Sequence, residues 1–149
     1  MTWQIRNMQP EYLMSLRQLY LDARQHTFNW QDISKFRLDD FDTATKDEEI
    51  LVAVSGNTPI GFVSWWEPDN FIHNLYVDAG YYRQGIGKSL LEHCLTKIGR
   101  PAALKCLQQN TPALLFYQSQ GWRVHSAGQS DDGNYFLMLF REPSATFHY

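Results

Sequence analysis

The stretch YYRQGIGKSLL, Tyr81–Leu91, follows a strand-like run, NFIHNLYV (70–77), and leads into a helix. Apolar residues recur at helical spacing between Lys88 and Ile98, and a Gly-Arg-Pro sequence then ends the helix. The next run, AALKCL (102–107), is typical of a short strand. A strand, a loop, a helix and a second strand in this order predict a right-handed crossover between two parallel strands.

The rest of the chain alternates between strand-like and helix-like segments. The predicted strands lie at 3–8, 49–55, 60–67, 122–127 and 134–140, and the predicted helices lie at 10–23, 31–38 and 112–120. The acidic segment 39–49 is predicted to be a loop. This order predicts an α/β (α+β) fold: a mixed, mostly antiparallel sheet with a central parallel pair and helices on both faces. Residues 1–149 are expected to form a single domain.

Composition and charge narrow the classes of function. The net charge of −3 and the pI near 5.9 offer no basic surface for nucleic acid or an anionic membrane. No run approaches the roughly 18 apolar residues of a membrane span, and the N-terminus lacks the apolar stretch of a signal peptide, so we expect a cytoplasmic protein. The cysteines, Cys94 and Cys106, lie in apolar segments and are expected to be buried and inert. No metal site is expected.

Two kinds of phosphate-binding loop fit the stretch poorly. Gly87-Lys88-Ser89 matches the end of a nucleotide-triphosphate loop, but the first glycine of that loop would fall on Tyr82. A dinucleotide fingerprint would need its third glycine at Leu90. A P-loop kinase is therefore kept only as an unfavoured alternative.

A third kind of loop fits better. Glycines at 85 and 87 would let a ligand approach the backbone N–H groups of residues 84–88 at a helix N-terminus. The loop resembles the coenzyme A pyrophosphate loop of the GNAT superfamily of N-acetyltransferases, (Arg/Gln)-x-x-Gly-x-(Gly/Ala) after a strand ending in valine. NTPALLFYQSQGW (110–122) resembles the family's C-terminal signature, Asn-x-x-Ala-x-x-(Phe/Leu)-Tyr-x-x-x-Gly-(Phe/Trp). Tyr82 departs from the loop pattern, and Arg83 and Lys88 either neutralise the pyrophosphate in its place or are solvated cations.

The resemblance implies an acetyltransferase (GNAT) fold and transfer of an acetyl group from acetyl-coenzyme A, a co-substrate, directly to a primary amine of a small molecule or protein. It implies cofactor contacts at the end of the strand 70–77, in the loop and near the second motif. These residues are Leu75, Tyr76, Val77, Arg83, Gln84, Gly85, Ile86, Gly87, Lys88, Ser89, Asn110 and Tyr117. A homodimer is compatible with the resemblance, and a non-catalytic acyl-coenzyme A sensor is the main alternative.

The resemblance also assigns catalytic roles. Tyr117 is expected to donate a proton to the leaving sulfur, because a phenol with a pKa near about 10 can protonate a thiolate in a dry site. Core packing is the alternative role for Tyr117, and helix capping is the alternative for Asn110. The base is open between His73, Glu67 and a water relay. Covalent catalysis through a cysteine is disfavoured, since neither cysteine has an evident activating neighbour.

The acceptor side is expected near residues 21–30 and 125–135. The aromatic residues Phe28, Trp30, Trp65 and Trp66, together with Asp39, Asp40 and Asp42, would favour a cationic amine if they formed one wall. Ordinary core packing and a solvated acidic loop explain the same residues equally well.

Overall fold

The computed structural model describes residues 3–27 and 33–141, so Phe28 and Trp30 of the expected aromatic wall lie outside the described residues. The elements follow one another as β1 (Trp3–Asn7), α1 (Leu13–Thr27), α2 (Asp40–Ala44), β2 (Glu49–Ser55), β3 (Thr58–Trp66), β4 (Phe71–Val77), α3 (Ile86–Leu95), β5 (Ala102–Leu107), α4 (Thr111–Ser119), β6 (Arg123–Ser130) and β7 (Gly133–Phe140). Short 3₁₀ helices occupy Pro10–Tyr12, Ile33–Lys35, Glu67–Asp69 and Ala79–Tyr81.

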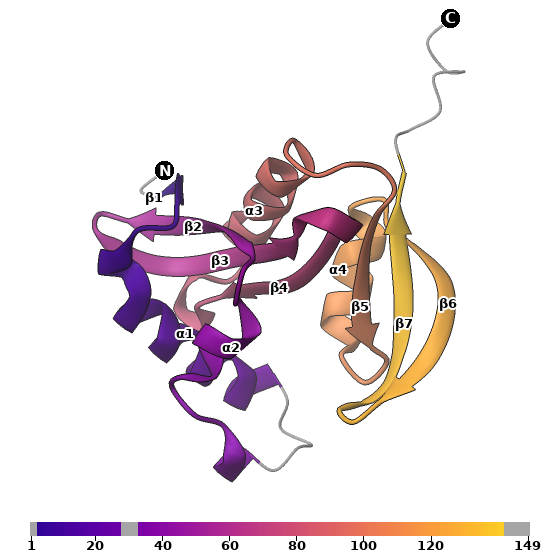
Figure 1. Cartoon of the computed structure of the whole chain (residues 1–149), viewed down its shortest axis with the longest axis horizontal. Helices are drawn as coiled ribbons and strands as arrows, with labels where there is room; N and C mark the ends of the chain where they lie inside the picture. Colours follow the sequence, from indigo (N-terminus) through magenta and orange to yellow (C-terminus); the bar gives the residue numbers. More distant parts are fainter. Residues whose placement is uncertain (1–2, 28–32, 142–149) are drawn as a thin grey trace, which may run out of the picture.

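The strands form one seven-stranded sheet in the order β1-β2-β3-β4-β5-β7-β6. The pair β4–β5 is parallel, and every other neighbouring pair is antiparallel. The mixed sheet with a central parallel pair is therefore confirmed. Figure 1 shows β4 and β5 diverging at the middle of the sheet, where the two halves of the molecule meet.

Helices cover both faces of the sheet, as predicted. One core contains Leu51, Trp65 and Leu90, and side chains of α4 pack against it, so α3 and α4 share a face. The other core contains Leu16, Phe41 and Phe62, which places α1 and α2 on the opposite face (Figure 1). No helix in the described residues combines the length and apolar character needed to cross a membrane.

Several local predictions are wrong or shifted. The segment 39–49, predicted to be a loop, contains α2, because Phe41 is buried with ring centroids 6.1 Å from Tyr20 and 5.2 Å from Phe62. Of the helix predicted at 31–38, the described residues contain only the 3₁₀ turn Ile33–Lys35. The helix predicted from Lys88 begins earlier, at Ile86, and ends at Leu95, before the buried Ile98.

Candidate active site

The two parallel strands separate soon after they meet. β4 and β5 pair only at Phe71–Ala103 and Ile72–Leu104, so the later residues of β4 pair with β3 but have no strand on their other side. A pocket of about 110 Å³ opens there. Its lining residues are His73, Leu75, Tyr76, Lys105, Cys106, Leu107, Asn110, Ala113 and Tyr117. Unpaired main-chain groups at the wall of a pocket are suited to hold polar atoms of a ligand.

A β-bulge places His73 at this pocket. Ser64 pairs with Asn74 but Trp65 pairs with Ile72, so His73 is the extra residue on β4. Ile72 belongs to the α3 side of the sheet, whereas Asn74 hydrogen-bonds to the carbonyl of Ala44 in α2 at 3.2 Å. A regular strand would put both side chains on one face, so the bulge reorients the strand at His73.

His73 contacts a carboxylate that sequence reasoning did not single out. Its Nδ1 lies against Oε2 of Glu48, and the other carboxylate oxygen, Oε1, is buried with no hydrogen-bond partner among the described residues. The side chain of Glu48 is 4% exposed and that of His73 is 45% exposed. The acidic segment 39–49 contains several equivalent carboxylates, so the sequence carried no signal for Glu48.

Tyr117 enters the pocket from α4. Asn110 caps this helix, because its Oδ1 accepts a hydrogen bond from the N–H of Ala113 at 3.3 Å. The Tyr117 ring lies 5.4 Å from that of Phe116 and 6.1 Å from that of Trp122, so the residue both packs in the core and lines the pocket. Burial, together with the nearby Cys106, raises the pKa of Tyr117 above its ordinary value. Its hydroxyl therefore keeps its proton at neutral pH.

The other candidates are placed less favourably for chemistry. Oε2 of Glu67 accepts a hydrogen bond from Trp65 Nε1 at 2.8 Å, and Glu67 is not among the residues that line the pocket. Burial raises the pKa of Cys106 to about 11 and, as the first of several causes, that of Cys94 to about 12. Both thiols are buried and unpaired, as predicted, and a thiolate nucleophile is disfavoured at neutral pH.

The glycine loop forms a turn that leaves backbone donors available. Asp78 accepts a hydrogen bond from the N–H of Gly80 at 2.9 Å, and Arg83 and Gly85 adopt φ values of +66° and +81°. The N–H of Ser89 bonds to the carbonyl of Gly85, whereas the N–H groups of residues 84–88 make no such turn or capping bond among the described residues. Free N–H groups at the start of a helix suit a pyrophosphate group.

Packing joins the loop to the pocket. A Cβ atom at Gly87 would lie 3.7 Å from Cζ of Phe116 and 3.8 Å from Cγ2 of Val77. These residues belong to α4 and β4, the elements that also carry Tyr117 and His73. Lys88 forms an exposed ion pair with Glu92 at 3.9 Å. The backbone of the loop therefore lies directly beside the elements that form the pocket.

Comparison with known proteins agrees with this geometry. Residues 13–122 match the model of the acetyltransferase (GNAT) family. The chain belongs to this family. GNAT enzymes use acetyl-coenzyme A, and the free N–H groups of the loop and the unpaired edge of β4 fit that cofactor. Among the described residues, no group of three or more His, Cys, Asp or Glu side chains could hold a metal ion.

Curated relatives within the GNAT family match about half of the chain. The peptidyl-lysine N-acetyltransferase YjaB of Salmonella typhimurium is 34% identical over 56% of this chain and 56% of its own length. The peptidyl-lysine N-acetyltransferase YiaC of Escherichia coli is 33% identical over 49% of each chain. The matched part of the chain thus spans about half the length of these relatives.

Solved structures of GNAT proteins share the whole fold. Apo YjaB of Escherichia coli has a TM-score of 0.79 at 20% identity, covering 94% of this chain and 98% of that one. PaiA N-acetyltransferase of Thermoplasma acidophilum, solved with coenzyme A, has a TM-score of 0.77 at 22% identity and covers 95% of this chain and 99% of that one. These likenesses confirm the GNAT fold.

Some of the residues expected to form a wall for a cationic acceptor have partners within the protein itself. Asp42 pairs with Arg17 and Asp40 pairs with Arg24, so the protein's own guanidinium groups neutralise both acids. The guanidinium of Arg24 also lies 4.1 Å from the ring centroid of Tyr20. Trp65 is buried in the core on the α3 side. The sequence could not show these pairings, because they join residues 16 to 25 positions apart.

Proposed function

We propose that this GNAT protein transfers an acetyl group from acetyl-coenzyme A directly to a primary amine. The observation that carries the proposal is the pocket between β4 and β5, where His73 and Tyr117 line one cavity. A base and an acid on the same cavity are what amine attack and thiolate departure require.

Main-chain groups of the loop and of β4 bind the cofactor in this proposal. Acetyl-coenzyme A, when bound, supplies the acetyl group as a thioester. The N–H groups of residues 84–88 hold its pyrophosphate, and main-chain groups of Leu75, Tyr76 and Val77 hold the pantetheine arm and polarise the carbonyl. One such backbone donor is worth about 3 kcal/mol in related oxyanion sites.

Two side chains of the pocket transfer the protons of the reaction. His73 takes a proton from the acceptor ammonium, which frees the lone pair that attacks. Tyr117 donates a proton to the departing sulfur; its phenol, whose pKa burial raises, carries that proton at neutral pH. Asn110 holds the start of α4 and thereby the position of Tyr117.

A lysine side chain of a protein is the acceptor class we propose to test first. The two curated relatives are named as peptidyl-lysine N-acetyltransferases. The pocket supports the same class of acceptor. His73, the proposed base, is half-exposed, so a long flexible lysine side chain can reach it from solvent.

The test has two stages. At 100 times its dissociation constant, acetyl-coenzyme A should stabilise the fold by about 2.7 kcal/mol, which a thermal-shift measurement resolves, whereas magnesium-ATP should not. Lysine-containing peptides, with polyamines and peptides with blocked lysines as controls, are then incubated with acetyl-coenzyme A and analysed by mass spectrometry. Stabilisation without acetylation of any amine would contradict the enzyme and favour a sensor, and stabilisation only by magnesium-ATP would contradict the loop assignment.

A further inference from the structure

We propose that Glu48 is a positioning residue, which fixes His73 in the tautomer with its hydrogen on Nδ1 and so leaves Nε2 to accept the acceptor's proton. The inference rests on the proposed function, because it assigns a partner to the base of that reaction. It adds a residue from outside both sequence motifs, at the junction of α2 and β2.

The contact itself determines the tautomer. An ionised carboxylate can only accept hydrogen bonds, so the hydrogen between Glu48 Oε2 and His73 Nδ1 belongs to the imidazole. In a neutral ring the lone pair is then on Nε2. Since the ring of His73 is half-exposed at the pocket and Glu48 is buried behind it, Nε2 is the nitrogen left for a substrate.

The chain around Glu48 is held in place by several hydrogen bonds. The N–H of Glu48 bonds to the carbonyl of Thr45 at 3.0 Å, and the Thr45 hydroxyl bonds to the carbonyl of Phe41 at 2.8 Å. Asn74, next to His73, ties β4 to the carbonyl of Ala44 and to the hydroxyl of Ser64. Both partners of the contact are therefore fixed to the same part of the sheet.

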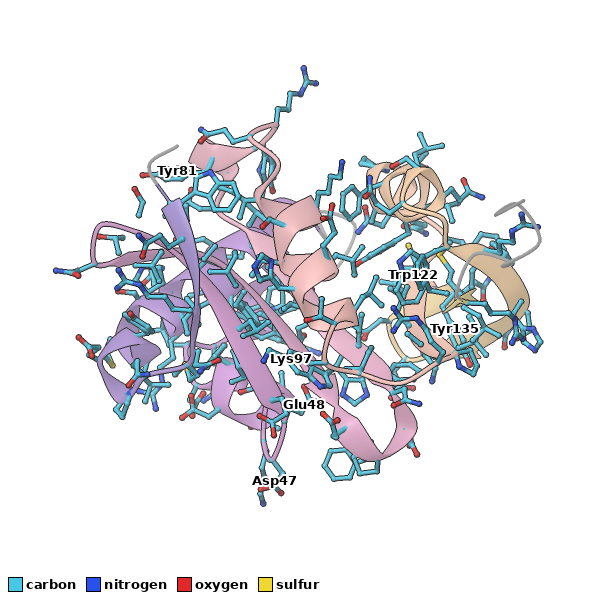
Figure 2. The ribbon with its side chains drawn as sticks, turned by 90° about the horizontal axis from the view of Figure 1, so that it is seen from above. Asp47, Glu48, Tyr81, Lys97, Trp122 and Tyr135 are labelled. Carbon is cyan, nitrogen blue, oxygen red and sulfur yellow. The ribbon has the colours of Figure 1, made fainter. Side chains whose placement is uncertain are left out.

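A left-handed turn of the backbone comes directly before the buried side chain of Glu48. Asp47 has a φ of +62°, a left-handed conformation that turns the chain immediately before Glu48. Figure 2 shows the result: Asp47 projects from the margin of the molecule, and Glu48 lies further in. A carboxylate withdrawn from water needs a compensating partner, and the imidazole of His73 is the one it contacts.

Most of the other side chains that face His73 are uncharged. Phe71 presents its ring at a centroid distance of 4.9 Å, and Tyr76 on the same strand and Tyr117 on α4 are neutral because burial raises the pKa of each phenol. Cys106 on β5 is likewise neutral, with its pKa raised to about 11. Lys105 on β5 is the remaining charged group of the pocket, and its ammonium lies 4.7 Å from the ring centroid of Tyr135.

The protons balance in this arrangement. His73 Nε2 takes one proton from the acceptor ammonium and releases it to water, while the other hydrogen stays on Nδ1 of the imidazole, hydrogen-bonded to Glu48. The C–N bond then forms and the C–S bond breaks, the nitrogen loses its second proton to solvent, and the sulfur takes a proton from Tyr117, which solvent restores. The products are an amide, a thiol and one proton in solution.

A pair of matched substitutions tests the role of Glu48. Glu48→Gln should lower kcat about 10- to 100-fold and leave the KM for acetyl-coenzyme A within about twofold, because an amide can donate to Nδ1 and favour the wrong tautomer. Glu49→Gln, the same change at the exposed neighbouring residue, is the control. Equal kcat values in Glu48→Gln and Glu49→Gln overturn the inference.

A second measurement needs no altered Glu48. In wild-type protein labelled with ¹⁵N-histidine, two-bond ¹H–¹⁵N spectra report the tautomer of each neutral imidazole, and the spectrum of His73→Gln identifies the signals of His73. We expect hydrogen on Nδ1, and hydrogen on Nε2 overturns the inference. If the wild-type protein is active but its hydrogen is on Nε2, the proposed function stands and the role of Glu48 does not. If the wild-type protein is inactive but its hydrogen is on Nδ1, the Glu48–His73 contact stands and the proposed function is contradicted.

Discussion

The glycine loop and the pocket between β4 and β5 differ in how they are built. The loop comes from one continuous stretch, and its working parts are backbone N–H groups at the start of α3. The pocket takes side chains from β4, β5 and α4, and Glu48 approaches His73 from the start of β2. The first site depends on the local path of the chain, and the second depends on the packing of the sheet.

This difference determines how each site should respond to mutation. A backbone site changes when the path of the chain or the space beside it changes, and single side chains at its surface matter little. A side-chain site changes when one functional group is removed. Substitutions in the two regions should therefore separate cofactor affinity from turnover.

The largest effect is expected in the pocket. Tyr117→Phe should lower kcat by about 100-fold or more and leave the Kd for acetyl-coenzyme A within about twofold, because phenylalanine keeps the packing against Phe116 and Trp122 but has no proton to donate. Steady-state kinetics and calorimetric titration measure the two constants. Tyr12→Phe, in the core on the α1 side, is the matched control. Equal turnover in the two variants would remove Tyr117 as the acid.

An intermediate effect is expected in the loop. A Cβ atom fits at Gly87, with contacts of 3.7 and 3.8 Å, but the γ carbons of valine would project further toward α4, β4 or the ligand. Gly87→Val should weaken acetyl-coenzyme A binding about tenfold, or ~1.4 kcal/mol, and Gly87→Ala should stay within about threefold of wild type. Turnover at saturating cofactor should change little. Undiminished affinity in Gly87→Val would show that the ligand does not approach this backbone.

The smallest effect is expected at the surface of the loop. Lys88 is exposed and already pairs with Glu92 at 3.9 Å, so salt and water screen its charge. Lys88→Ala should raise the Kd for acetyl-coenzyme A about two- to threefold at low salt and less at high salt. Glu92→Ala, which removes the partner instead, should not weaken binding. A tenfold loss in Lys88→Ala would make a side-chain cation the main anchor in place of the backbone.

Much of the fold was predictable because the sequence patterns that indicate strands, helices and turns involve residues close together in the chain. The period of apolar residues indicated most strands and helices, and the crossover unit at 70–107 predicted the parallel pair that β4 and β5 form. The acidic segment 39–49 misled the prediction because its composition is polar, although one residue, Phe41, buries its ring and anchors α2. Asn110 caps α4, which is the alternative role that the sequence offered for this residue.

The candidate site was predictable only in part. The two motifs pointed to the loop and to Tyr117, and the structure shows that His73 and Tyr117 line one pocket. Glu67, the other side chain considered as the base, accepts a hydrogen bond from Trp65 and is not among the residues that line the pocket. Two of the three acids expected to attract a cationic acceptor pair with Arg17 and Arg24. Composition shows that such charges exist and cannot show which of them neutralise one another.

The sequence by itself determined the order of most elements, the glycine loop and the family, because each depends on residues close together in the chain. Only the tertiary structure decided that a bulge turns β4 at His73 and that Glu48 is buried behind its imidazole. The physical reason is that burial and hydrogen bonding between side chains act over distances in space. His73 and Glu48 are 25 positions apart in the chain and become neighbours only when β2, β3 and β4 form one sheet.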